Sequence, residues 1–227
     1  MDRTQIAIQV SKTLSLVPGI IKVPVASLEI FVLHDFLSSN ECEALVAMID
    51  SQRKPSRLMS SSHPDPGFRT SETCNLDPND RLVGSVESRI SALLGIDAQC
   101  GEFLQGQRYG AGQEFKPHHD FLRESESYWA HQKEIGGQRT WTAMTYLNVP
   151  EKGGETFFPR LRLKLIPRRG NLVAWNNLDG RGKPNAFSLH QGMPVVTGVK
   201  FIITKWYRER PWALGARMSS RQRQALT

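Results

Sequence analysis

The chain has 227 residues, 39% of them hydrophobic, with 18 glycines, 13 prolines and a formal net charge of +7. This composition argues against wholesale disorder and predicts one large, loop-rich globular domain, alone or with an N-terminal extension. No apolar run approaches the length of a membrane span, and the N-terminus lacks the basic-then-apolar layout of a secretory signal. The three cysteines are odd in number and widely spaced, which favours free thiols in a reducing compartment. We therefore expect a cytoplasmic protein with no membrane partner.

Part of the positive charge lies in two arginine-rich segments, 159–169 and 208–223. A basic face can attract nucleic acid or an acidic protein. These segments contain few aromatic residues, however, and Trp206 and Tyr207 stand just before the second of them. The pattern therefore favours a solvated surface that is rich in arginine.

The N-terminal part of the chain is expected to contain three helices and one strand. Apolar residues at helical spacing predict a short helix within 1–20 that packs on the outside of the domain, and 28–37 is β-branched and aromatic enough for a strand. Ser38 with Glu41 forms a capping box, which predicts the start of a second helix. Its inward stripe comprises Cys42, Leu45, Val46 and Ile49.

Residues 54–68 have the composition of a loop, and a third helix is expected over 80–94 with Gly95 as its C-terminal stop. Leu82, Val86, Ile90 and Leu93 or Leu94 are predicted to face inward.

After this helix the pattern changes to short strands separated by Gly, Pro or Asn. The expected strands cover 101–109, 114–121, 140–148, 155–158, 161–166, 171–175, 186–190 and 199–207. Eight short strands behind helices predict a mainly β fold with flanking helices, a jelly-roll or cupin-like double sheet. The longest expected loop, 121–138, could overhang a site, and residues from 211 onward are expected to form a basic, mobile tail.

Two histidines and an aspartate stand together in the middle of the chain. If Phe115 to Phe121 is extended, His118 and Asp120 point to one face and His119 to the other. A His and an Asp on one face can hold a divalent metal from one side. Because His-x-Asp is common by chance, the hypothesis requires a third ligand.

Four other histidines are candidates for the third ligand: His34, His63, His131 and His190. His190 ends a strand-like segment, and Lys200 follows it inside an apolar run. A lysine there is costly unless its charge is paired. Its amine either extends to the edge of the sheet or pairs with a carboxylate.

A site of two histidines and one aspartate is a facial triad with open positions, which favours Fe(II) in an oxygenase. Zinc in a hydrolase is the alternative, but that chemistry does not require a buried lysine nearby.

Seven segments, in order along the chain, are similar to those of a known family. They are FVLHDFLSSNECEALV, RTS (69–71), YGAGQEFKPHHDF (109–121), RTWTAMTYLN (139–148), GGETFFP (153–159), PRRGNLVAW (167–175) and HQGMPVVTGVKFIITKW (190–206). The chain thereby resembles the prolyl 4-hydroxylase-like branch of the 2-oxoglutarate- and Fe(II)-dependent dioxygenases. The resemblance covers 28–210 as a dioxygenase domain, between an N-terminal extension (1–27) and a basic C-terminal tail (211–227), and it implies a double-stranded β-helix.

The resemblance also implies the site residues and the reaction. His118, Asp120 and His190 correspond to the iron ligands, and no further catalytic residue is implied. Tyr109, Thr156 and Lys200 correspond to contacts of 2-oxoglutarate, while Arg139 and Trp206 correspond to positions on the substrate side. The implied activity is hydroxylation of an unactivated C–H bond, in a peptidyl proline or a related residue, with O2 as oxidant. Succinate and CO2 are released, and ascorbate is the expected reductant.

Three departures from the family pattern bear on the substrate. Phe115 stands where prolyl hydroxylases commonly have Tyr, Arg208 where some members have His, and 121–138 has no obvious counterpart in the collagen-type enzymes. The substrate therefore remains open between a peptide or protein and a free amino acid or other small metabolite. A nucleic-acid demethylase is disfavoured because those enzymes use Arg where this chain has Lys200. A non-catalytic binding module is disfavoured because all three ligands are present.

Overall fold

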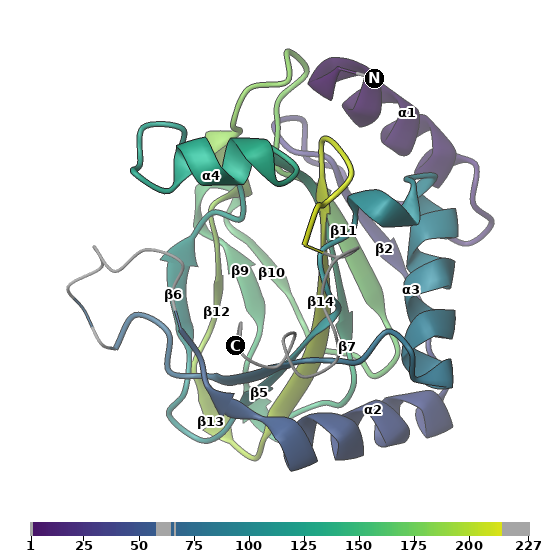
Figure 1. The fold of residues 1–227 in the computed structure, drawn as a ribbon. Coiled ribbons are helices and arrows are strands. Elements are labelled where there is room, and N and C mark those ends of the chain that lie inside the picture. Colours follow the sequence, from purple (N-terminus) through teal and green to yellow (C-terminus); the bar gives the residue numbers. More distant parts are fainter. Residues whose placement is uncertain (1, 58–64, 66, 215–227) are drawn as a thin grey trace.

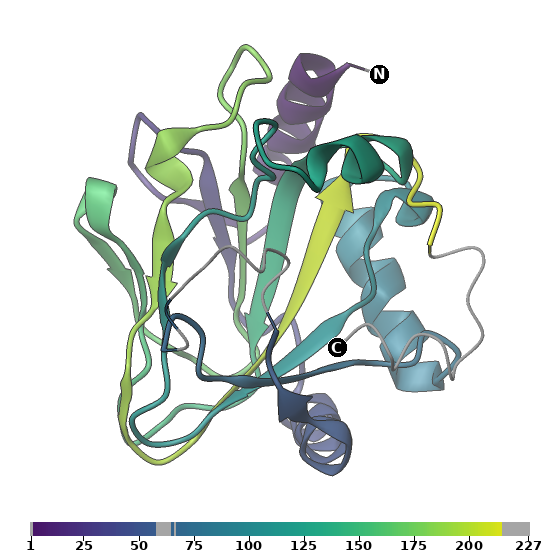
Figure 2. The ribbon, with the colours of Figure 1, turned by 60° about the vertical axis from the view of Figure 1, so that its left-hand side comes forward.

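Two antiparallel sheets face each other and form a jelly roll in the computed structural model, which describes residues 2–57, 65 and 67–214 (Figures 1 and 2). The larger sheet has the strand order β1-β2-β11-β7-β14-β5-β4-β3 and the smaller has β10-β9-β12-β6, while β13 and β8 form a separate pair. The mainly β double sheet expected from the sequence is confirmed.

The strands are β1 (Ile21–Lys22), β2 (Ile30–Leu33), β3 (Lys54–Pro55), β4 (Glu72–Asn75), β5 (Gln105–Tyr109), β6 (Phe115–His118), β7 (Arg139–Tyr146), β8 (Lys152–Gly153), β9 (Thr156–Phe158), β10 (Leu163–Leu165), β11 (Leu172–Asn176), β12 (His190–Gly192), β13 (Val195–Thr197) and β14 (Lys200–Arg208). The helices are α1 (Arg3–Ser15), α2 (Ser39–Gln52), α3 (Arg81–Leu94) and α4 (Trp129–Glu134). Helices α1, α2 and α3 lie on the outer side of the larger sheet, and α4 crosses one end of the jelly roll (Figure 1). No helix in the described part of the chain has the length and apolar character needed to cross a membrane.

Local capping signals fix the helix ends. The expected capping box of Ser38 and Glu41 is present at α2, and Gly95 ends α3 in the left-handed region with φ 66°. A second capping box, of Asp2 and Gln5, starts α1. In α3 the inward face includes Val83, which is fully buried, where the sequence had suggested the only partly buried Leu82.

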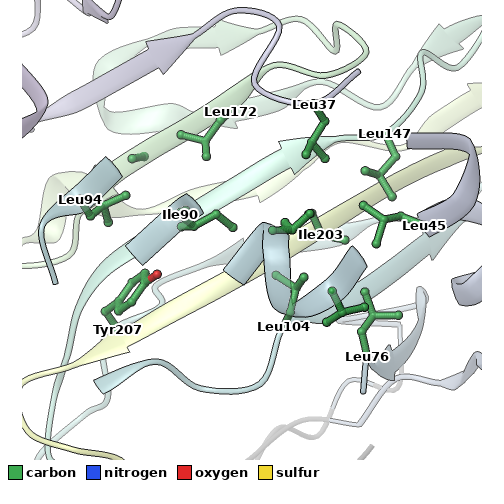
Figure 3. Packing of buried hydrophobic residues seen from close by; sticks show 14 of the residues in the cluster. Leu37, Leu45, Leu76, Ile90, Leu94, Leu104, Leu147, Leu172, Ile203 and Tyr207 are labelled. Carbon is green, nitrogen blue, oxygen red and sulfur yellow. The ribbon is translucent and has the colours of Figure 1, made fainter. Parts of the chain in front are cut away.

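Strand alternation divides the buried residues into two clusters. One cluster fills the space between the helices and the larger sheet and includes Leu45, Ile90 and Ile203 (Figure 3). The second cluster lies on the opposite face of the same strands, between the two sheets, and includes Met144 and Ile202. Since successive side chains of a strand point to opposite faces, β7 and β14 serve both clusters. The inter-sheet face is the one that carries the candidate site.

Several sequence expectations differ from the structure. Residues 186–188 form a 3-10 helix, so β12 only begins at His190. Strand β6 ends at His118, and the expected loop 121–138 contains helix α4. Strand β4 was missed because its length is only four residues and three of them are polar.

The sequence suggested a basic, mobile tail from residue 211 onward, but the first residues of this segment pack against the rest of the domain. Trp212 is buried, its ring lies 4.8 Å from that of Phe103, and its backbone N–H donates to the Gln99 carbonyl oxygen. Residues 215–227 lie outside the described part. All three cysteines are free, as expected, with Cys42 and Cys74 buried.

Candidate active site

The pairing of β6 with β12 brings the two candidate histidine ligands together. His190 is the direct antiparallel partner of His118, and the centroids of their imidazole rings lie 4.3 Å apart. Asp120 lies two residues beyond the end of β6, with carboxylate oxygens 3.9 Å from His118 Nε2 and 3.8 Å from His190 Nε2. One ligand atom from each residue lies within 4.8 Å of the others. The register across the sheet thus brings His190 into a group with His118 and Asp120 that could hold a metal ion.

The other histidines do not join this group. His34 Nδ1 lies 2.7 Å from the Asn171 side-chain nitrogen, and His119 Nε2 lies 3.4 Å from the Ala186 carbonyl oxygen. His131 belongs to α4. His63 lies outside the described residues.

Hydrogen bonds hold the three ligands in an orientation suited to a metal ion. His118 Nδ1 lies 2.8 Å from the Lys116 carbonyl oxygen, and His190 Nδ1 lies 2.9 Å from that of Ser188. If each Nδ1 carries the proton and donates it, each Nε2 keeps its lone pair for a metal. No specific sequence pattern marks these backbone acceptors.

The carboxylate of Asp120 is supported by a short chain of polar side chains. Thr142 Oγ1 donates to Asp120 Oδ2 over 2.8 Å, and Asn177 Nδ2 donates to Thr142 Oγ1 over 2.9 Å. Both supporting residues are fully buried. Sequence analysis missed them, although the alternation of RTWTAMTYLN places Thr142 on the face opposite Trp141.

The electrostatics of the three residues fit a divalent cation. Burial, followed by the proximity of His190, holds the pKa of His118 well below its usual value, so the ring is neutral near pH 7. Burial alone would raise the pKa of Asp120, but its electrostatic interactions with His190, His118 and Arg139 outweigh this effect and lower the pKa. Two imidazoles and an ionised carboxylate match the facial donor set of Fe(II) oxygenases. The residues present therefore fit Fe(II).

Lys200 lies beside this group as a buried amine that forms no ion pair within the described part of the chain. It is 1% exposed and lines a small cavity of about 30 Å³ with His190, Tyr109 and Thr156. No carboxylate among the described residues forms an ion pair with its amine. Burial lowers the pKa of Lys200 to about 7, and the charge of Glu155 opposes this only in part. A carboxylate ligand would supply the missing charge.

Two tyrosine rings lie next to the amine of Lys200. Lys200 Nζ lies 5.3 Å from the ring centroid of Tyr109, its partner in the sheet, and 5.5 Å from that of Tyr146. Tyr146 donates its hydroxyl hydrogen to Thr156 Oγ1 over 2.7 Å, and Tyr109 donates to Gln107 Oε1 over 2.7 Å. Tyr109, Thr156 and Lys200 thus line one cavity. Tyr146 was missed, although it shares the inward face of β7 with Thr142.

A larger cavity of about 420 Å³ opens on the triad from the side of α4. Arg139 and Trp206 both line it, with the guanidinium 4.2 Å from the indole centroid. Arg139 binds both oxygens of the buried Glu102 carboxylate over 2.6 Å each. The 121–138 segment contributes Leu122, Tyr128, His131, Gln132 and Ile135 to the lining. It therefore overhangs the site as expected.

Arg208 connects this cavity wall to the overhanging segment. It forms an ion pair with Glu102 over 2.5 Å and donates to Gly137 O and Gln132 Oε1 over 2.7 and 2.8 Å. Burial would raise the pKa of Glu102, but the charges of Arg139 and Arg208 outweigh it and lower the pKa. Sequence analysis missed Glu102, since its partners lie far along the chain.

The inner face of the jelly roll carries two histidines, one aspartate and a buried lysine that has no ion pair within the described residues. This combination defines the class of Fe(II)- and 2-oxoglutarate-dependent oxygenases. The family model of the 2OG-Fe(II) oxygenase superfamily matches residues 104–208. The chain belongs to the prolyl 4-hydroxylase-like branch of this superfamily and is a 2-oxoglutarate-dependent hydroxylase.

Individual relatives agree with this assignment. Prolyl 4-hydroxylase 1 of Arabidopsis thaliana is 32% identical over 202 residues, covering 80% of this chain and 69% of its own. The rat prolyl 4-hydroxylase subunit alpha-1 is 32% identical over 186 residues, covering 78% of this chain and 34% of its own. The collagen prolyl hydroxylase of Paramecium bursaria Chlorella virus-1, solved with 2OG, is 27% identical with a TM-score of 0.63, covering 79% of this chain and 95% of that one.

Proposed function

We propose that this hydroxylase acts on a peptidyl proline or a related residue in a peptide or protein, inserting one oxygen atom of O2 into an unactivated C–H bond. The observation that carries the proposal is the pair of cavities that meet at the triad. The small one contains the unpaired Lys200, and the large one opens toward solvent beneath α4. A volume of about 420 Å³ lies within the range of ligand pockets, roughly 300–1,000 Å³. The names of the relatives, all prolyl hydroxylases, support a prolyl substrate.

Each site residue has a proposed role. His118, Asp120 and His190 would hold Fe(II), which supplies the activation of O2 when 2-oxoglutarate is bound. Lys200 would form a charge-assisted hydrogen bond with the distal carboxylate of 2-oxoglutarate. Tyr109 and Thr156, which line the same cavity, would add hydrogen bonds to that carboxylate.

The walls of the large cavity would orient the substrate. The guanidinium of Arg139 lies over the ring of Trp206 in the cavity lining, and Glu102 fixes the arginine in place. The 121–138 segment would exclude water while the target C–H bond is oxidised. We also propose ascorbate as the reductant that keeps the iron ferrous, and the cytoplasm as the location. Three free thiols support a reducing compartment.

The second candidate is hydroxylation of a free amino acid or other small metabolite. The short helix α4 above the mouth favours it, because a segment that covers the site suits a small substrate. A nucleic-acid substrate remains disfavoured on the grounds that Lys200, and not an arginine, occupies the cosubstrate position.

The test is the formation of succinate from 2-oxoglutarate under Fe(II) and ascorbate with three substrate pools. These are proline-containing peptides, free amino acids and methylated oligonucleotides. Stimulation by the peptides, with hydroxylated product identified by mass spectrometry, is the expected result. Stimulation by amino acids alone or by oligonucleotides would refute the peptide substrate. The control is His190→Ala, which should remove both the stimulated and the background turnover.

A further inference from the structure

The large cavity carries an excess of positive charge. Among the described residues that line it are four arginines, Arg57, Arg69, Arg139 and Arg208, and only two carboxylates, Glu102 and Asp120. Asp120 belongs to the metal-binding group. Fe(II) and 2-oxoglutarate carry charges of +2 and −2, so their binding leaves the balance unchanged. The cavity therefore presents net positive charge to a substrate.

Glu102 cannot neutralise the arginines on its own side of the cavity. It lies between Arg139, which it binds through both oxygens, and Arg208, which it contacts over 2.5 Å. One carboxylate thus serves two guanidinium groups, and all three side chains are largely buried. One unit of positive charge is left on this wall. The low dielectric of such a site strengthens its attraction for an anion.

Arg69 provides a second positive charge in the lining of the large cavity. Its guanidinium lies 4.8 Å from the ring centroid of Phe115, and this ring stacks on His118 with 3.4 Å between centroids. Only one aromatic ring therefore separates the guanidinium from a metal ligand. The residue belongs to the RTS segment (69–71), which has no role so far in the proposed reaction.

The hydrogen bonds of Arg69 leave its charge unpaired. Its Nε donates to Ser71 Oγ over 3.1 Å and its Nη2 to Gln105 Oε1 over 2.9 Å, and both acceptors are neutral. No carboxylate of the described residues forms an ion pair with it. The guanidinium has five N–H donors in a fixed fork, so it retains the capacity to bind a carboxylate. Arg57 lines the same cavity, is exposed, and also lacks an ion pair within the described part of the chain.

We propose that the substrate is an acidic peptide in which an aspartate or glutamate close to the hydroxylated residue binds Arg69. This inference rests on the proposed function and deepens it by naming the charge of the substrate. The acidic side chain would enter beside Phe115 while the target residue lies over the triad. Arg57 and the wall of Glu102, Arg139 and Arg208 would attract further acidic residues of the peptide. Lysine-rich peptides would be excluded by repulsion.

The experiment compares matched peptides that contain one proline and differ only by Asp or Asn at one flanking position. Succinate formation and hydroxylated product are measured for each position within three residues of the proline. We expect kcat/KM to be roughly tenfold higher for Asp than for Asn at one position, mainly through KM, because one charge-assisted bond is gained. Raising the ionic strength should reduce the Asp advantage and leave the Asn peptide unaffected.

Variants of Arg69 assign the effect to this residue. Arg69→Gln should bring the Asp to Asn ratio close to one, and Arg69→Glu should make a Lys peptide better than an Asp peptide. The control Arg169→Gln removes an exposed arginine that pairs with Glu43 outside the cavity, and it should keep the wild-type ratio. The affinity for 2-oxoglutarate reports whether each variant is folded. If the variants do not fold, the wild-type ratio and its salt dependence still decide the question.

The outcomes separate this inference from the proposed function. Equal kcat/KM for Asp and Asn peptides at every position would overturn the acidic substrate and leave peptide hydroxylation standing. An Asp preference that persists in Arg69→Gln would overturn the role of Arg69. Turnover of free acidic amino acids without turnover of any peptide would overturn both the peptide substrate and this inference.

Discussion

Replacing Lys200 by Met is expected to have two effects of opposite sign. The metal-free protein should become more stable near neutral pH, while the affinity for 2-oxoglutarate should fall. Both effects follow from one property of the site, namely a buried cation with no counter-charge until a carboxylate binds. A lysine that merely extended along the sheet edge would show neither effect.

The sign and size of the stability effect follow from the pKa of Lys200, which burial lowers from 10.5 to about 7. Because the folded state binds the proton less tightly than the unfolded state, the protonated lysine destabilises the fold. This cost is fully present below about pH 7 and declines as the pH rises toward 10.5. Each pKa unit corresponds to about 1.4 kcal/mol, so the cost at low pH is on the order of 5 kcal/mol. Methionine has a similar shape and carries no such cost.

The loss of cosubstrate affinity can also be estimated. A hydrogen bond to a charged group contributes about 1.5–3 kcal/mol, which corresponds to roughly a 10- to 100-fold increase in Kd for 2-oxoglutarate. This Kd can be measured by calorimetry with Fe(II) under anaerobic conditions. Binding of the distal carboxylate should also raise the pKa of Lys200, so wild-type protein should take up a proton above pH 7 when 2-oxoglutarate binds.

Urea denaturation of the metal-free protein at pH 6, 7, 8 and 9 tests the stability effect. Wild-type stability should gain about 1.4 kcal/mol per pH unit above pH 7 relative to Lys200→Met. The matched control is Lys205→Met on the same strand, because Lys205 is also buried but pairs with Glu87 over 2.5 Å. That variant should be destabilised, since it leaves a carboxylate unpaired. A less stable Lys200→Met protein with unchanged 2-oxoglutarate affinity would refute the reasoning.

Three further predictions concern the triad and its surroundings. Asp120→Ala should abolish turnover, whereas His119→Ala should keep much of it because His119 lies outside the metal-binding group; equal loss of iron binding in both would contradict this geometry. Thr142→Val removes the hydrogen bond to Asp120 and should weaken Fe(II) binding roughly tenfold, as measured by metal titration. Arg208→Met should cost about 3 kcal/mol of stability in denaturant titration, because buried acceptors lose their donor. An unchanged unfolding midpoint would show that this arginine does not hold the 121–138 segment.

Features that depend on neighbouring residues could be predicted from the sequence. The capping box at Ser38, the stop at Gly95 and the common direction of His118 and Asp120 all depend on a few consecutive residues. Lys200 could be singled out because a charge in an apolar run is costly wherever the strand is placed. The resemblance to the hydroxylase family added the assignment of His190, which local spacing alone had left open among four candidates.

The tertiary structure decided what depends on pairing between distant segments. His190 meets His118 only through the register of β12 against β6, and this register is set by packing across the whole double sheet. Glu102 joins Arg139 and Arg208 from three separate parts of the chain, so no local pattern marks it as their shared partner. Only the folded positions of the described carboxylates show, likewise, that none of them forms an ion pair with Arg69. The sequence by itself therefore determined the chemistry of the metal site, while the folded chain determined the charge that it presents to a substrate.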